Sequence, residues 1–186
     1  MNKKLRFLTH AAIIAALYVV LTLIARAFGL DSGAVQFRLS EALTILPFFT
    51  AAAIPGLFVG CFLANILCGC FFWDVVFGSL ATLLGAVLTW LLHRYARSLI
   101  EKRASLPDSM FSRLLRQHKW LAPVPPILCN MLIIPFVLRY VYGLEESLYF
   151  FAGTVGLGEV VTCGILGMAL LHALLPKKEI FQLEDK

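Results

Sequence analysis

Long runs of apolar residues constrain this chain more than any other feature. A helix needs about 20 mostly apolar residues to cross a bilayer. Windows of this kind predict six helices, at about residues 6–28, 40–53, 54–70, 74–95, 120–142 and 148–175. With 60% hydrophobic and 15% charged residues, the composition argues against a water-soluble enzyme. We therefore predict an all-α integral membrane protein with six transmembrane helices, forming a single domain over residues 1–186.

The second and third segments are the shortest of the six. They hold roughly 14 and 17 residues, which span only about 21 and 26 Å at 1.5 Å per residue. The alternative for these two segments is a broken or tilted pair of helices.

The basic residues predict the orientation. If the N-terminus is cytoplasmic, 13 of the 16 Lys and Arg residues fall on the cytoplasmic side of six crossings. The other three, Arg26, Arg38 and Arg139, lie at the outer ends of segments. This bias follows the positive-inside rule and favours cytoplasmic N- and C-termini. Topology thus accounts for the net charge of +5, and nucleic acid is not an expected partner.

The longest polar stretch, about residues 96–119, joins the fourth and fifth segments. Its second part, residues 109–118, alternates basic and apolar residues after Ser109, a residue type suited to an N-cap. An amphipathic helix is expected there, either lying on anionic lipid or serving as a docking surface for a cytoplasmic partner.

Several motifs of enzymes and cofactor sites are absent from the sequence. It contains no P-loop and no H-E-x-x-H, and Gly156 and Gly158 follow no strand. We expect no catalytic residue, metal or cofactor in this chain, so work that consumes energy needs another chain. The five cysteines fit small buried residues, with an outer disulfide at Cys68 or Cys70 left open.

Charged residues inside apolar segments need an explanation, because each costs about 2.5–3.5 kcal/mol on the insertion scale. Glu159 lies 11 residues after Leu148, roughly 16 Å along its helix. Two interpretations of Glu159 remain open. It could form an ion pair with Arg139 that holds the last two helices together, or it could line a polar cavity.

Other polar residues gather at the same, outer side. Asp74 could merely complement a helix dipole, and Asn130 could merely bond two helices together. Taken together with aromatic neighbours, the group predicts a pocket with aromatic walls and a few polar anchors. The candidate substrate-binding residues are Arg38, Glu41, Asn65, Phe72, Trp73, Asp74, Asn130, Arg139 and Glu159. An excess of carboxylate over guanidinium favours a planar ligand rich in N–H donors, including a cationic one.

The first segment carries two overlapping patterns of small residues, Ala11/Ala15 and Ala12/Ala16. Such spacing lets another helix approach closely. The stripe either packs inside the molecule or receives the helix of a partner protein.

Five short stretches, in this order and spacing, resemble the QueT family. They are VQFRLSEAL at residues 35–43, GCFLAN at 60–65, WDVVFG at 73–78, ATLLG at 81–85 and GEV at 158–160. The resemblance covers nearly the whole chain, apart from the polar stretch at residues 96–119. Members of this family are substrate-binding S-components of energy-coupling-factor (ECF) transporters, a branch of the ABC importers of bacteria.

The resemblance implies a bundle like that of other S-components, in the bacterial cell membrane. It implies that the outer face binds a queuosine precursor or queuine, which are 7-deazaguanine bases, with Glu41, Asp74 and Glu159 as ligand candidates. It further implies a transmembrane coupling protein and two ATPase subunits that use ATP, with the four alanines of the first segment contacting the coupling protein. The connection at about residues 29–39 is expected to close over the substrate before the subunit topples in the membrane.

Two other functions remain as alternatives to that of an S-component. A small proton-coupled transporter would use Glu159 as its proton site, but the internal repeats typical of such carriers are absent. An intramembrane acid–base enzyme would need two carboxylates within reach of each other. Asp74 at the mouth and Glu159 near mid-depth argue against the enzyme.

Overall fold

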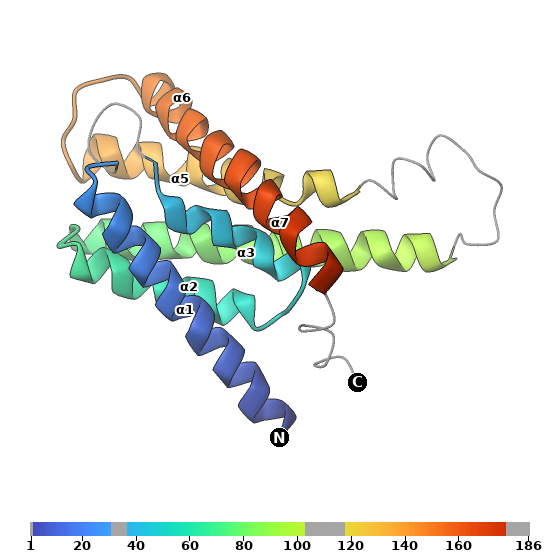
Figure 1. The fold of residues 1–186 in the computed structure, drawn as a ribbon. Coiled ribbons are helices and arrows are strands. Elements are labelled where there is room, and N and C mark those ends of the chain that lie inside the picture. Colours follow the sequence, from blue (N-terminus) through green and yellow to red (C-terminus); the bar gives the residue numbers. More distant parts are fainter. Residues whose placement is uncertain (1, 31–36, 103–117, 178–186) are drawn as a thin grey trace.

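The computed structural model describes residues 2–30, 37–102 and 118–177, and the regular structure in these ranges is entirely helical. The elements are α1 (Lys3–Ala27), η1 (Leu39–Phe48), α2 (Ala53–Leu67), α3 (Phe72–Lys102), η2 (His118–Leu121), α5 (Val124–Tyr140), α6 (Leu148–Glu159), η3 (Val160–Gly167), α7 (Met168–Leu174) and η4 (Leu175–Lys177). The last four follow one another without a break and form one helical rod (Figure 1). Most of the predicted amphipathic helix, and residues 31–36 of the predicted closing connection, lie outside the described residues.

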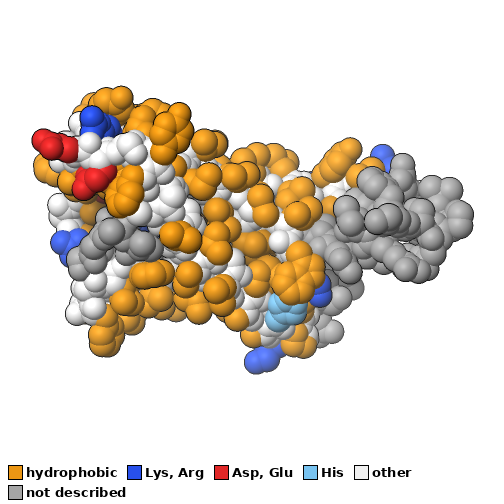
Figure 2. All heavy atoms as spheres, turned by 90° about the horizontal axis from the view of Figure 1, so that it is seen from above, with side chains coloured by type: hydrophobic (Ala, Val, Ile, Leu, Met, Phe, Trp, Pro, Cys, Tyr) orange, Lys and Arg blue, Asp and Glu red, His pale blue; other side chains and the backbone are white. Residues whose placement is uncertain are grey.

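Four helices are long and apolar enough to cross a membrane. They are Lys3–Ala27, Phe72–Ile100, Lys119–Tyr140 and Leu148–Lys177. The two other apolar helices, η1 and α2, have only 10 and 15 residues. Figure 2 shows hydrophobic side chains along the length of the visible face, with charged side chains near its ends. The all-helical membrane class is confirmed, with four candidate spans.

Helix η1 lies at the centre of the molecule, between α1 and the α6–α7 rod (Figure 1). It is a 3-10 helix of 10 residues, and runs of more than 3–4 residues are uncommon. Three residues per turn bring Glu41 and Thr44 onto one face and Leu43 and Leu46 onto another. The leucines join the hydrophobic core with α1 and α2. The polar face turns towards η3, where Thr44 lies 3.3 Å from the Cys163 thiol.

Helices α1 and α2 cross at very close range. A Cβ atom added to Gly56 would lie 2.7 Å from the carbonyl oxygen of Ala11. One added to Gly60 would lie 2.8 Å from the Tyr18 Cβ and 3.0 Å from the Ala15 Cα. The two glycines, four residues apart on α2, therefore provide the room that Ala11 and Ala15 need.

The small-residue stripe of α1 thus splits into two halves. Ala11 and Ala15 pack inside the molecule against α2, whereas Ala12 and Ala16 are exposed. The expectation that all four alanines contact an external partner is wrong for Ala11 and Ala15. Successive residues are about 100° apart around a helix, so the two pairs cannot face the same neighbour.

All five cysteines are free thiols. Cys61, Cys68 and Cys163 are buried, and Cys70 and Cys129 are partly buried. The outer disulfide considered for Cys68 or Cys70 is not formed.

Candidate functional site

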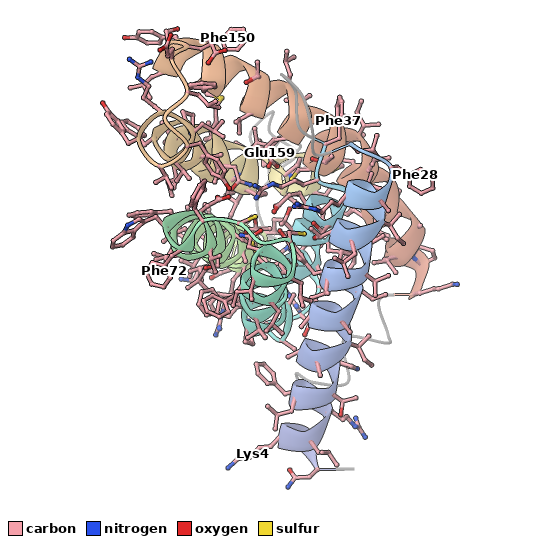
Figure 3. The ribbon with its side chains drawn as sticks, turned by 90° about the vertical axis from the view of Figure 1, so that its left-hand side faces the viewer. Lys4, Phe28, Phe37, Phe72, Phe150 and Glu159 are labelled. Carbon is pink, nitrogen blue, oxygen red and sulfur yellow. The ribbon has the colours of Figure 1, made fainter. Side chains whose placement is uncertain are left out.

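Buried polar side chains from six elements meet inside the bundle. The buried members with hydrogen-bonding side chains include Ser40, Glu41, Thr44, Asn65, Asp74, Thr82, Asn130, Glu159 and Thr162. Seen end-on in Figure 3, Glu159 lies in the middle of the helices, with Phe28, Phe72 and Phe150 at the periphery. Because buried polar groups need partners, their contacts define the site.

Asn130 of α5 links two buried glutamates. Its amide Nδ2 donates to Glu159 Oε1 at 2.9 Å and to Glu41 Oε2 at 3.5 Å. The Tyr18 hydroxyl donates to the other Glu41 oxygen, and Thr82 Oγ1 approaches the same oxygen at 3.5 Å. Glu41 and Glu159 are only 1% and 6% exposed. Helices far apart in sequence therefore place two carboxylates side by side.

Cys163 completes this arrangement. Its sulfur lies 3.0 Å from Glu159 Oε2 and 3.3 Å from the Glu41 carbonyl oxygen, and its single S–H can donate to either one. Cys163 lies in η3, a stretch of π-helix that begins directly after Glu159. Such stretches are rare and frequent at functional sites. We name the group formed by Glu41, Asn130, Glu159 and Cys163 the polar centre.

The polar centre contains a set of groups that suits a cation. One ligand atom each from Glu41, Glu159 and Cys163 lies within 4.8 Å of the others. Carboxylate oxygens suit hard cations and N–H donors, whereas a thiolate suits soft metals, so the set is mixed. Each member already has hydrogen-bond partners in the protein. The set consists of two carboxyl groups and one thiol, and all three are buried.

A second polar group lies around Gly78 on α3. A Cβ atom there would meet Asn65 Nδ2 at 3.0 Å, Asp74 Oδ1 at 3.6 Å and Arg38 Nη1 at 4.0 Å. The strongest electrostatic attraction of Arg38 is to Asp74. Glycine at position 78 thus leaves space for three polar side chains.

Tyr142, just after α5, closes this second group. Its hydroxyl donates to Asp74 Oδ2 at 2.6 Å, and its ring meets Phe71 edge-on at 5.0 Å between centroids. Burial and the Asp74 carboxylate raise the pKa of Tyr142. We name Arg38, Asn65, Asp74 and Tyr142 the outer group.

Cys61 of α2 joins the two groups. Thr82 Oγ1 donates to its sulfur at 3.4 Å, and Asn65 Nδ2 approaches the sulfur at 3.7 Å. Thr82 also reaches Glu41. The polar centre and the outer group therefore form one network.

The structure brings together six of the nine candidate residues: Arg38, Glu41, Asn65, Asp74, Asn130 and Glu159. It leaves Phe72 and Trp73 outside, 69% and 55% exposed. Both precede Asp74 in the first turn of α3, and a helix rotates about 100° per residue. Once Asp74 faces inwards, the two aromatic side chains face outwards.

Arg139 also lies away from the carboxylates. Its guanidinium donates to backbone carbonyls of the α5–α6 loop, at residues 144–146. The alternative of an ion pair between Arg139 and Glu159 is therefore wrong. Arg139 follows Asn130 by nine residues, which is about two and a half turns, so it lies on the opposite face of α5.

Sequence reasoning missed four contributors: Tyr18, Thr82, Tyr142 and Cys163. Tyr18 follows Ala15 by three residues and shares its face of α1, and Cys163 follows Glu159 by four. These spacings were readable in the sequence. Tyr142 follows the helix and carried no such signal.

Two buried carboxyl groups do lie within reach of each other, although they are not the Asp74 and Glu159 compared in the sequence. Glu41 and Glu159 lie side by side, so the spacing of carboxyl groups alone does not exclude an acid–base enzyme.

Comparison with known proteins identifies the family. The model of the QueT transporter family matches residues 8–176, which include both polar groups. The queuosine precursor transporter QueT of Lactococcus lactis subsp. cremoris (strain MG1363) is 42% identical over 73 residues, 39% of this chain and 42% of that protein. The aligned part thus spans less than half of that relative. No solved structure matches the chain. The chain therefore belongs to the QueT transporter family and is a multi-pass protein of the cell membrane.

Proposed function

We propose that this chain is the substrate-binding S-component of an ECF-type importer, and that it binds a queuosine precursor or queuine. The family and the name of the Lactococcus relative support the substrate class. The observation that carries the proposal is the enclosed network of the polar centre and the outer group. A membrane protein tolerates such buried polar groups where they serve a ligand or an ion path.

The chemistry of the network suits a 7-deazaguanine base. The edge of the base that carries N–H groups would donate two parallel bonds to a carboxylate of the polar centre. Its carbonyl oxygen would accept from an N–H donor of either group, such as Asn130 or Arg38. Tyr18 and Tyr142 would supply aromatic surface in place of Phe72 and Trp73.

The proposed topology has six crossings, with both termini in the cytoplasm. The distribution of Lys and Arg supports this orientation. Helices η1 and α2 would then form a short pair that enters the bundle beside the longer spans. The α2–α3 turn and the α5–α6 loop would face outwards, so that substrate enters from outside.

Energy for uptake would come from partner subunits. We propose one transmembrane coupling protein and two ATPases, because the sequence holds no nucleotide-binding motif. The exposed half of the α1 stripe, Ala12 and Ala16, would contact the coupling protein. Toppling of the whole subunit would then carry the substrate to the cytoplasmic side.

The Glu41–Glu159 pair favours one second candidate, a proton-coupled transporter that works without partners. Affinity purification of the tagged full chain separates the two. Co-purification of a coupling protein and two ATPases, with binding of a 7-deazaguanine in the absence of ATP, supports the S-component. Uptake by the purified chain alone in vesicles, driven by a proton gradient, would refute it.

A further inference from the structure

We propose that the end of the bundle opposite the α5–α6 loop binds the phosphate group of an anionic phospholipid. The site consists of Lys119 and Trp120 of η2, His172 of α7 and Lys177 of η4, and we name these four residues the inner rim. They lie outside the polar centre and the outer group, so the inference does not depend on which substrate the chain transports. In the proposed orientation, the inner rim faces the cytoplasmic leaflet.

The depth of the inner rim follows from two candidate membrane spans. One span runs over Lys119–Tyr140 and the other over Leu148–Lys177. The α5–α6 loop joins them at one end, so the beginning of the first span and the end of the second lie together at the other end (Figure 1). The ends of a spanning helix lie at the level of the lipid headgroups. Both ammonium groups are therefore placed at the depth of lipid phosphate.

A hydrophobic cluster holds the elements of the inner rim together. Ala122, just after η2, packs with Met168 and Leu171 of α7, and Leu175 of η4 packs against the same cluster. Each residue of the inner rim lies within three positions of a member of this cluster. Segments that are about 50 residues apart in sequence thus present their polar ends side by side.

Trp120 contacts two other members of the inner rim. Its ring centroid lies 5.2 Å from that of His172, and the Lys119 ammonium lies 6.0 Å from the Trp120 centroid. The indole nevertheless remains 54% exposed. Tryptophan favours the membrane–water interface, because its ring is apolar while its N–H is polar. An indole in this position offers apolar contact to the glycerol region of a lipid and an N–H donor to a phosphate oxygen.

No acidic side chain in the described part of the chain balances the cations of the inner rim. The described Asp and Glu side chains belong to the polar centre, the outer group and the α5–α6 loop: Glu41, Asp74, Glu145, Glu146 and Glu159. The loop is at the opposite end, and the two groups are inside the bundle. A lipid phosphate brings one negative charge and several acceptor oxygens, to which a lysine ammonium can donate.

An exposed apolar stripe favours a lipid over a soluble anion. Leu121, Val124 and Leu128 follow Trp120 at spacings of three and four residues, and each is at least 40% exposed. The stripe leads from the inner rim into the membrane. The acyl chains of a lipid would lie along it while the phosphate stays at the lysines, whereas a soluble anion would use the lysines alone.

Native mass spectrometry of the detergent-purified full chain tests the inference. The two probes share their acyl chains and differ in charge: dioleoylphosphatidylglycerol is anionic and dioleoylphosphatidylcholine is zwitterionic. We expect the anionic lipid to bind at least about tenfold more tightly, because each lysine near an anionic lipid contributes roughly fivefold. Equal affinities for the two lipids would overturn the inference. Displacement of the anionic lipid by an equal concentration of inorganic phosphate would also overturn it, since the site would then recognise a free anion.

Variants locate the site. Lys119→Gln combined with Lys177→Gln should remove most of the preference for the anionic lipid. Lys4→Gln combined with Lys102→Gln is the control, because it removes the same charge from exposed lysines of α1 and α3 and should retain the preference. Unchanged melting temperatures without added lipid show that both double variants are folded. A preference that survives in the first double variant, or that falls equally in both, would contradict the inner rim as the binding site.

Discussion

The close crossing of α1 and α2 makes a quantitative prediction for Gly60→Ala. The added Cβ would lie 2.8 Å from the Tyr18 Cβ and 3.0 Å from the Ala15 Cα. Carbon atoms in contact prefer about 3.5–4.0 Å, so the shortfall is roughly 0.5–1.2 Å. Both neighbours belong to α1, and neither atom is the free end of a flexible side chain. The two helices must therefore separate.

The expected cost is that of overpacking, about 1–3 kcal/mol. Alanine is also the better helix former by roughly 0.8–1.0 kcal/mol, which would mask part of the loss. Gly153→Ala corrects for this gain, because Gly153 lies in α6 with no atom within 4 Å of its added Cβ. The difference between the two variants then isolates the packing effect.

Thermal unfolding of the detergent-purified proteins measures the difference. At roughly 2–4 °C per kcal/mol for a chain of this size, Gly60→Ala should melt about 2–12 °C below Gly153→Ala. Because Tyr18 donates to Glu41, Gly60→Ala should also weaken ligand binding. Equal melting temperatures for the two variants would refute the close contact between α1 and α2.

Three further predictions use other parts of the structure. Ala15→Leu should lower the melting temperature, because Ala15 packs against α2. Ala12→Leu should leave the melting temperature unchanged and abolish co-purification of the partner subunits. Retained co-purification with Ala12→Leu would show that the exposed stripe is not the docking face. Tyr142→Phe should lower the melting temperature at pH 7, since it removes the bond to Asp74. Folding raises the pKa of Tyr142, so the stabilisation from its hydrogen bond is complete below the ordinary tyrosine pKa of about 10 and is lost as the pH rises above it. The melting-temperature deficit of Tyr142→Phe should therefore shrink above that pH. A deficit that is constant from pH 7 to 11 contradicts this assignment. A membrane-impermeant maleimide should label Cys70 in intact cells, and labelling only after lysis would reverse the proposed orientation.

The sequence predicted the helical membrane class because hydrophobic length is a one-dimensional property. It also named six residues of the polar network, because a charged or amide side chain inside an apolar run stands out by its cost. It did not predict which of these residues touch. Glu41 and Glu159 are 118 positions apart, and the register of η1, with three residues per turn, brings them together.

The errors share a physical cause, which is the direction in which side chains point. Phe72 and Trp73 are neighbours of Asp74 in sequence, but they lie on the far side of α3. Arg139 lies in the last turn of α5, but on the face of the helix opposite Asn130. Tyr18, in contrast, resembles an ordinary core residue until its hydroxyl is seen to reach Glu41.

The most direct test of the account is a calorimetric titration of the purified chain, without ATP or partner subunits, with a 7-deazaguanine base. The account predicts saturable binding of one ligand per chain, strongly reduced in Asn130→Leu and unchanged in Glu145→Gln. The melting temperature of each variant without ligand shows that it is folded. Binding that is equal in folded Asn130→Leu, or no binding of any 7-deazaguanine by the unaltered chain, would contradict it.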